Sequence, residues 1–251
     1  MGRLILVPTP LGNLGDITLR ALEQLKSADI VLAEDTRTSQ KLLSHYGIQA
    51  KLRSFHLHNE HKVLEETVRL IATHNEVVLV SDAGTPGISD PGFLLVRACH
   101  EAGIPVECLP GPVALIPALV KSGFPSDRFV FEGFLPHKKG RQSRIQTLIH
   151  ERRTVIFYES PHRLLKTLQQ CAEILGKERK AAVVREISKL HEELHSGSLD
   201  ELVRYFTQTA PRGEIVLLIH PVEDVSDMEN SDDQLDAAEL FLRGPAKRKK
   251  A

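Results

Sequence analysis

A glycine- and proline-rich segment, SDAGTPGISDPG (residues 81–92), follows the apolar run VVLV at 77–80. Its three glycines and two prolines predict a loop that leaves backbone groups open to a ligand. The segment contains Asp82 and Asp90 but no Lys or Arg, so it offers no positive charge to a phosphate. These residue types favour a ligand that is neutral or cationic at its reactive centre.

Two further turns of the same kind follow apolar runs, PTPLGNLGD at 8–16 and PGPVAL at 110–115. Neither the dinucleotide fingerprint GxGxxG nor the phosphate loop GxxxxGK[ST] occurs in any of the three. S-adenosylmethionine (SAM) fits such loops, because it carries a sulfonium, an amino-acid zwitterion and an adenine but no phosphate. Any one loop is better explained as a tight turn, whereas three such loops after successive strands favour cofactor binding.

A short charged segment, EDTR at 34–37, follows the apolar run IVLA. Glu34 or Asp35 could accept a proton from a substrate hydroxyl, and Arg37 could hold a phosphate or fix the carboxylate. These three are the candidate catalytic residues. A structural ion pair explains the same residues equally well.

Positive charge is concentrated in KKGRQSR at 138–144, with Lys138, Lys139, Arg141 and Arg144. We expect these four residues, together with Arg163 of SPHR, to contact RNA phosphates. A solvated helix surface is the alternative.

Histidines and cysteines give weaker indications. HLHNEH at 56–61 is not an HExxH zinc motif, and it precedes a helical pattern in which polar residues cap, so we expect no metal. The three cysteines form no CxxC pair and are expected to be buried thiols of a reducing compartment.

These segments need strands and helices to position them. Apolar runs at 4–7, 30–33, 77–80 and 106–109 predict strands covered on both faces. Helical patterns lie between them; Thr18 is expected to cap a helix that ends near Ser27, and another has Leu64, Val68 and Ile71 on one face. This alternation predicts a parallel sheet with ligands at the carboxyl ends of its strands.

A second set of runs, at 129–134, 155–158, 181–184 and 215–219, predicts another α/β domain, with a hairpin arm at 190–199. We therefore expect an N-terminal domain at 1–123, a C-terminal domain at 124–222 and a flexible tail at 223–251 that is acidic and then basic. The cleft between the two domains is the expected site.

The 251-residue chain has a formal net charge of −1, so any nucleic-acid surface must be local. The start, MGRLILVPTP, is too short in apolar residues for a signal peptide or a membrane span. The sequence thus predicts a cytoplasmic protein without a membrane segment.

The chain resembles the tetrapyrrole-methylase superfamily of SAM-dependent (class III) methyltransferases, and within it the branch that methylates ribosomal RNA. The matching segments span residues 4 to 219 and include LVPTPLGNLGDITLRALEQLKSADIVLAEDTR, VSDAGTPGISDPG, VECLPGPVALIPAL, FEGFLPHKKGR, VIFYESPHR and RGEIVLLI. Tetrapyrrole methylases have a glycine-proline-glycine first loop and a GDP second loop, whereas this chain has PTPLG and GTP, as the RNA branch does.

The resemblance implies two α/β domains with SAM folded in the cleft between them, a homodimer, and no metal for methyl transfer. Its implied cofactor contacts are Leu11, Ala83, Gly84, Thr85, Ile88, Val113, Ala114, Glu159 and Gly213. It implies methylation of a cytidine ribose 2′-hydroxyl in 16S ribosomal RNA of the small subunit. Two alternatives stay open: a tetrapyrrole C-methyltransferase, against which the basic segment argues, and a non-catalytic RNA-binding module that needs no SAM.

Overall fold

The first sheet is parallel throughout. The structure, a computed structural model, describes residues 2–56 and 60–222. The strands are β1 (Arg3–Leu6), β2 (Ile30–Ala33), β3 (Leu52–Ser54), β4 (Glu76–Val80) and β5 (Val106–Cys108), in the spatial order β3-β2-β4-β1-β5. Because all pairings are parallel, the carboxyl ends of the strands lie at one edge, as the sequence predicts. Strand β3 was not predicted, because LRS contains no apolar run.

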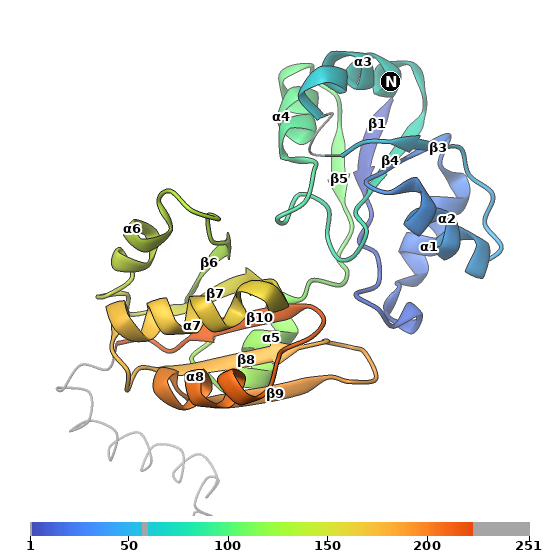
Figure 1. Cartoon of the computed structure of the whole chain (residues 1–251). Coiled ribbons are helices and arrows are strands. Elements are labelled where there is room, and N and C mark those ends of the chain that lie inside the picture. Colours follow the sequence, from blue (N-terminus) through green and yellow to red (C-terminus); the bar gives the residue numbers. More distant parts are fainter. Residues whose placement is uncertain (1, 57–59, 223–251) are drawn as a thin grey trace, which may run out of the picture.

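Helices cover both faces of this sheet (Figure 1). One apolar cluster joins the sheet to α1 (Leu19–Ser27) and α2 (Thr36–His45), and another joins it to α3 (Glu60–Thr73) and α4 (Phe93–Glu101). Thr18 caps α1 as expected, its hydroxyl accepting from the Ala21 amide at 3.1 Å. A 3₁₀ turn, η1 (Leu14–Asp16), lies within the first glycine-rich loop.

The second sheet is mixed. Its strands are β6 (Phe129–Phe134), β7 (Thr154–Glu159), β8 (Lys180–Arg185), β9 (Glu193–Ser198) and β10 (Ile215–Ile219), in the order β6-β7-β10-β8-β9. β6 and β7 run parallel, and the remaining neighbours run antiparallel. The hairpin arm predicted at 190–199 is confirmed as β9, which pairs with β8.

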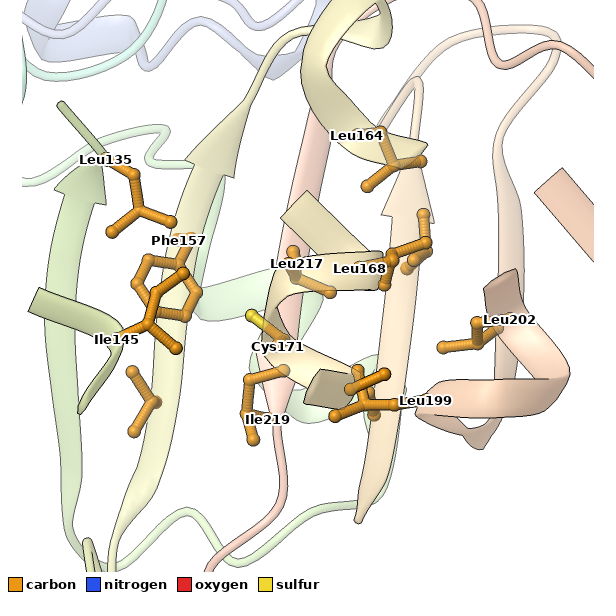
Figure 2. Packing of buried hydrophobic residues seen from close by; sticks show 14 of the residues in the cluster. Leu135, Ile145, Phe157, Leu164, Leu168, Cys171, Leu199, Leu202, Leu217 and Ile219 are labelled. Atoms are coloured by element: carbon orange, nitrogen blue, oxygen red, sulfur yellow. The ribbon is translucent and has the colours of Figure 1, made fainter. Parts of the chain in front are cut away.

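The core of the second domain is built on one face of this sheet. Figure 2 shows Phe157 and Leu217 of the sheet packed against side chains of three covering helices, with Cys171 among these side chains. These helices are α6 (Arg141–Gln146), α7 (Pro161–Leu175) and α8 (Leu199–Gln208). Cys171 is fully buried, and burial raises the pKa of its thiol to about 12. It therefore behaves as a core side chain rather than a reactive thiol.

Helix α5 (Leu115–Ser122) covers the opposite face of the second sheet. Its Leu115, Ala118 and Leu119 pack against β7, β8 and β10. By packing, α5 thus belongs with the second sheet, and the chain passes from one sheet to the other at residues 109–114, ahead of the expected division at Gly123. Where the chain divides into independently folding domains stays a prediction, and the expected tail lies outside the described residues.

The described helices include none with the length and apolar character that a membrane crossing requires.

Candidate active site

A cavity of 380 Å³ lies where the two domains meet, at the carboxyl edge of the first sheet. The loops after β1, β2, β4 and β5 reach it from the first domain. The ends of β6 and β7, the turn after β8 and the start of β10 reach it from the second domain. Both sheets therefore contribute to one site.

The three glycine-rich loops are fastened to one another at this cavity. Thr9 and Gly84 form an isolated antiparallel bridge, with both amide-to-carbonyl distances at 2.9 Å. The Thr85 hydroxyl donates to the Pro112 carbonyl at 2.9 Å, which joins the second loop to the third. The loops thus present a fixed backbone surface rather than three independent turns.

Gly84 requires its residue type for two reasons. Its φ of +82° lies in the left-handed region that favours glycine. A Cβ at this position would lie 3.3 Å from Leu11 Cδ2, in a loop that lines the cavity. A side chain here would therefore strain the backbone and occupy space beside the ligand.

The expected cofactor residues are brought together by the fold, except for Ile88. The cavity is lined by Leu11, Ala83, Gly84, Thr85, Val113, Ala114, Glu159 and Gly213, whereas Ile88 is partly exposed on the second loop and is not among the lining residues. Within the described part of the chain, no Lys, Arg or His lines the cavity. Its apolar walls and its lack of cations suit a ligand without phosphate.

Three carboxylates from the first domain line the same cavity: Glu34, Asp82 and Asp90. None of these three carboxylates forms a salt bridge within 4.0 Å with a described residue. Burial raises the pKa of all three, and it takes that of Asp90 to about 7. The charges of Glu34 and Asp82 add to the shift at Asp90.

The other two catalytic candidates of EDTR, Asp35 and Arg37, form an ion pair with each other. Asp35 is the N-cap of α2 and accepts from the Arg37 amide at 2.8 Å. The Arg37 guanidinium, 86% exposed, binds the same carboxylate at 2.6 Å and lowers the pKa of Asp35 to about 2. Glu34 lines the cavity, while Asp35 and Arg37 do not. A carboxylate this acidic is a weak proton acceptor, so the geometry favours the ion-pair interpretation for Asp35 and Arg37.

Glu159, from the end of β7, is the cavity carboxylate of the second domain, and it is held by cations. It is 2% exposed and lies 3.4 Å from an Arg141 nitrogen and 3.3 Å from Arg163 Nε. The Thr167 hydroxyl donates to it at 2.6 Å, and the Ser160 amide donates at 2.9 Å. Its charge and orientation are therefore fixed by the fold.

This network changes the interpretation of the basic segment. Arg141, expected on the RNA surface, is 3% exposed, and its Nε donates to Gln170 at 2.6 Å. Arg163 donates to the Leu135 carbonyl at 2.5 Å and reaches Glu159. In this arrangement both guanidinium groups bind protein atoms rather than an external phosphate. The spacing of charges in the sequence could not reveal that Arg141, directly after Gly140, points inward.

The remaining members of the basic segment are exposed. Lys138 and Lys139 lie in the turn before α6 and form no ion pair with any described residue. Arg144 is half-exposed but makes a two-pronged ion pair with Glu132 of β6. The two lysines are thus the free cations of the segment.

Several lining residues were not assigned to the site from the sequence. They are Asp82, Ser89, Asp90, Phe134, Tyr158, Ser160, Pro161, Ile187, Glu214, Ile215 and Val216. Asp90 lies in the loop already identified, and Glu214 follows Gly213, so adjacency was the available signal for these two. Phe134 and Tyr158 are side chains at the ends of strands, and periodicity does not distinguish them from core residues.

Residues 2–56 and 60–222 contain no group of three or more His, Cys, Asp or Glu side chains placed to hold a metal ion. His58 of the HLHNEH segment lies outside those residues.

The chain belongs to the family described as Tetrapyrrole (Corrin/Porphyrin) Methylases, whose sequence model matches residues 3–203. It is a SAM-dependent methyltransferase. Among solved structures, it is similar in fold to uroporphyrin-III-C-methyltransferase from Thermus thermophilus, with a TM-score of 0.62 at 19% identity, covering 88% of this chain and 94% of that one. The methyltransferase CobJ gives a TM-score of 0.67 at 17% identity, covering 88% and 95%.

Curated relatives are much closer in sequence. The chain is 51% identical to "Ribosomal RNA small subunit methyltransferase I" of Synechocystis sp., over 87% of this chain and 79% of the relative. It is 46% identical to the protein of the same name from Thermotoga maritima, over 87% of this chain and 98% of the relative. The protein of that name from Escherichia coli O157:H7 is 48% identical, over 87% and 77%.

The residues present fit SAM. The Gly84 position leaves the backbone open where a Cβ would intrude, and no cation lining the cavity among the described residues would repel the sulfonium. Bound SAM supplies an electrophilic methyl group. The loops provide the surface that would hold it, and the carboxylates lie on the same wall.

Proposed function

We propose that the protein methylates 16S ribosomal RNA of the small ribosomal subunit, on the 2′-hydroxyl of a cytidine ribose. The observation that carries the proposal is a cavity lined from both domains by the residues assigned to SAM, with the exception of Ile88. The chain is also 46–51% identical to relatives named for methylation of small-subunit ribosomal RNA. A cavity without phosphate-binding cations supports SAM, and free lysines outside it support an RNA substrate.

The residues contribute mainly by positioning. The fastened loops hold the cofactor in one orientation, and the wall formed by Phe134 and Tyr158 on the second domain limits where a ribose can enter. Alignment of the attacking oxygen with the methyl carbon and sulfur accounts for most of the expected rate gain. Leu11, Ala83, Gly84, Thr85, Ile88, Val113, Ala114, Glu159 and Gly213 are the proposed cofactor residues.

RNA phosphates are bound by Lys138 and Lys139 in this proposal. Arg144 joins them by exchanging its contact with Glu132 for a phosphate. Arg141 and Arg163 support the cavity wall instead, through Glu159. As the resemblance implies, the enzyme works as a homodimer in the cytoplasm. Light scattering of the purified protein checks the dimer, and cell fractionation checks the location.

The decisive experiment compares 16S ribosomal RNA from cells with and without the gene, by nuclease mapping and mass spectrometry. The proposal expects one cytidine-containing fragment to lose 14 Da, about the mass of one methylene, in the deletion strain and to regain it on complementation. A catalytically impaired but folded variant that restores the mass would contradict it. Methylation of a tetrapyrrole and not of small subunits by purified protein would favour the C-methyltransferase, and RNA binding without SAM binding would favour the non-catalytic module.

A further inference from the structure

Asp90 lines the cavity but has no part in positioning the cofactor or the ribose. It follows Ser89, whose φ of +64° is uncommon for a residue other than glycine. A Cβ on Gly133 of β6 would lie 3.2 Å from the Ser89 hydroxyl, so this part of the loop reaches across to the second domain. Backbone conformations of this kind cost free energy and persist where the surroundings impose them. Asp90 is therefore held at the junction of the two domains.

The groups around Asp90 come from every element that meets there. Glu34 follows β2 with His56 near it, and Ser81 and Asp82 follow β4. Glu214 precedes β10, and Tyr158 is the penultimate residue of β7. Glu60 of α3 accepts from the Gly92 amide at 3.2 Å on the far side of the loop. Most of these neighbours are acidic, and the side-chain hydrogen bond from Ser81 is the main favourable contact of the Asp90 carboxylate.

The three cavity carboxylates of the first domain differ in the hydrogen bonds that they accept from backbone amides. Asp82 Oδ1 accepts from the Asp35 amide at 3.1 Å, and Glu34 Oε2 accepts from the Asp82 amide at 3.4 Å. Asp90 accepts no backbone amide of the described residues. Its oxygens therefore retain the most capacity to accept a proton from a ligand in the cavity.

From this geometry we propose that Asp90 is the general base of the methyl transfer, and that Glu34 and Asp82 act on it through their charges. The inference rests on the proposed function. The proton of the ribose 2′-hydroxyl passes to an Asp90 oxygen while the 2′-oxygen bonds to the methyl carbon. The electron pair of the broken carbon–sulfur bond remains on sulfur, which leaves a neutral thioether, so charge and atoms balance.

The raised pKa of Asp90, about 7, suits this task. A base whose pKa lies near the working pH combines a large ionised fraction with a real affinity for the proton. Asp35, with a pKa of about 2, lacks that affinity. The residue that the sequence pattern singled out as a catalytic candidate is thus the poorer base of the two.

The test is single-turnover methylation of small ribosomal subunits from pH 5.5 to pH 9 at saturating SAM. The wild-type rate should rise about tenfold per pH unit below pH 7 and level off above it, because only ionised Asp90 accepts a proton. Asp90→Asn should lower the plateau on the order of a hundredfold or more and remove this rise. Glu34→Gln should move the midpoint to lower pH, because it removes a charge that raises the pKa of Asp90.

A second readout does not depend on turnover. Because the pKa of folded Asp90 is raised above its ordinary value of 3.8, its ionisation weakens the fold as the pH rises from about 4 through about 7. SAM-free Asp90→Asn should therefore melt at a higher temperature than wild type at pH 8 and lose this advantage at pH 4. Asp127→Asn, an exposed acid-to-amide change outside the cavity, is the matched control for both readouts.

The outcomes are separable. If Asp90→Asn methylates at the wild-type rate at pH 8, or keeps the wild-type pH profile, Asp90 is not the base. If Glu34→Gln removes the pH-dependent rise while Asp90→Asn keeps it, Glu34 is the base. If wild-type protein binds SAM and methylates no ribosomal RNA, the proposed function fails, while the melting comparison still reports whether Asp90 titrates as inferred.

Discussion

The two domains bring carboxylates to the same cavity in opposite electrostatic settings. Glu159 of the second domain is buried and held by Arg141, Arg163 and Thr167, so its charge is compensated within the fold. Asp90 of the first domain lies among other acids, with no ion pair to a described residue. The comparison indicates that a carboxylate supports the architecture where its charge is neutralised, and keeps the capacity to accept a proton where it is not.

The largest effect is expected from removing a cation that neutralises Glu159 in the second domain. Arg141→Met should lower the free energy of unfolding by about 3–5 kcal/mol, because it removes the more deeply buried of the two cations beside the buried Glu159 carboxylate. Chemical denaturation measures this. The double variant Arg141→Met with Glu159→Gln should recover part of the loss. If its loss instead equals the sum of the losses in Arg141→Met and Glu159→Gln, the pair is not coupled.

The next effect concerns the loop side of the cavity. Gly84→Trp should weaken SAM binding on the order of a hundredfold or more, since the indole fills the space beside Leu11 and the φ of +82° is retained only under strain. Calorimetric titration with SAM checks it. Gly103→Trp is the matched control, because Gly103 also has positive φ but no atom within 4 Å of a built Cβ, and it lies outside the cavity. Normal SAM affinity in folded Gly84→Trp would exclude this loop from the cofactor site.

A smaller effect, on RNA binding, is expected from Lys138 and Lys139, the residues of the basic segment that form no ion pair with a described residue. Replacing Lys138 and Lys139 together by Ala should reduce the slope of log affinity for small subunits against log salt by about one unit per lost phosphate contact. SAM affinity should stay unchanged, because neither lysine lines the cavity. Lys166→Ala with Lys177→Ala is a control of equal charge. An unaltered salt slope in the Lys138 and Lys139 variant would return the turn to a solvated surface.

The smallest effect compares two neighbours in EDTR. Asp35→Ala should lower the melting temperature slightly through loss of the α2 cap, with methylation per folded molecule within a few-fold of wild type. Arg37→Ala should cost less, because its ion pair is largely exposed. Thermal unfolding and single-turnover rates measure both. A hundredfold loss of turnover in Asp35→Ala would place that carboxylate in the chemistry after all.

Much of this fold could be predicted from short-range sequence patterns. The continuous apolar runs identified the strands other than β3 and β9, and Thr18 marked the start of α1, because both signals depend on a few adjacent residues. The glycine-rich loops could be assigned to one site because parallel strands end at one edge. The packing of α5 on the second sheet could not be predicted, since an apolar helix face does not specify which sheet covers it.

The candidate site was harder to predict where function depends on side-chain partners. Arg141 and Lys138 are equivalent in a sequence reading of the basic segment, yet one is buried against Gln170 and the other is exposed. Asp35 and Asp90 likewise differ only in what surrounds them. Partners distant in the chain decide these cases, and a single sequence does not contain that information.

The placement of α5 also bears on the order of events during synthesis. The strands of the first sheet are complete once Cys108 has been made, so that sheet can form early. The apolar face of α5 is fully covered only when β10 has been made, because this middle strand of the second sheet comes about a hundred residues later. Until then Leu115 and Leu119 of the emerging chain are incompletely covered, and such exposed apolar surface is what chaperones protect.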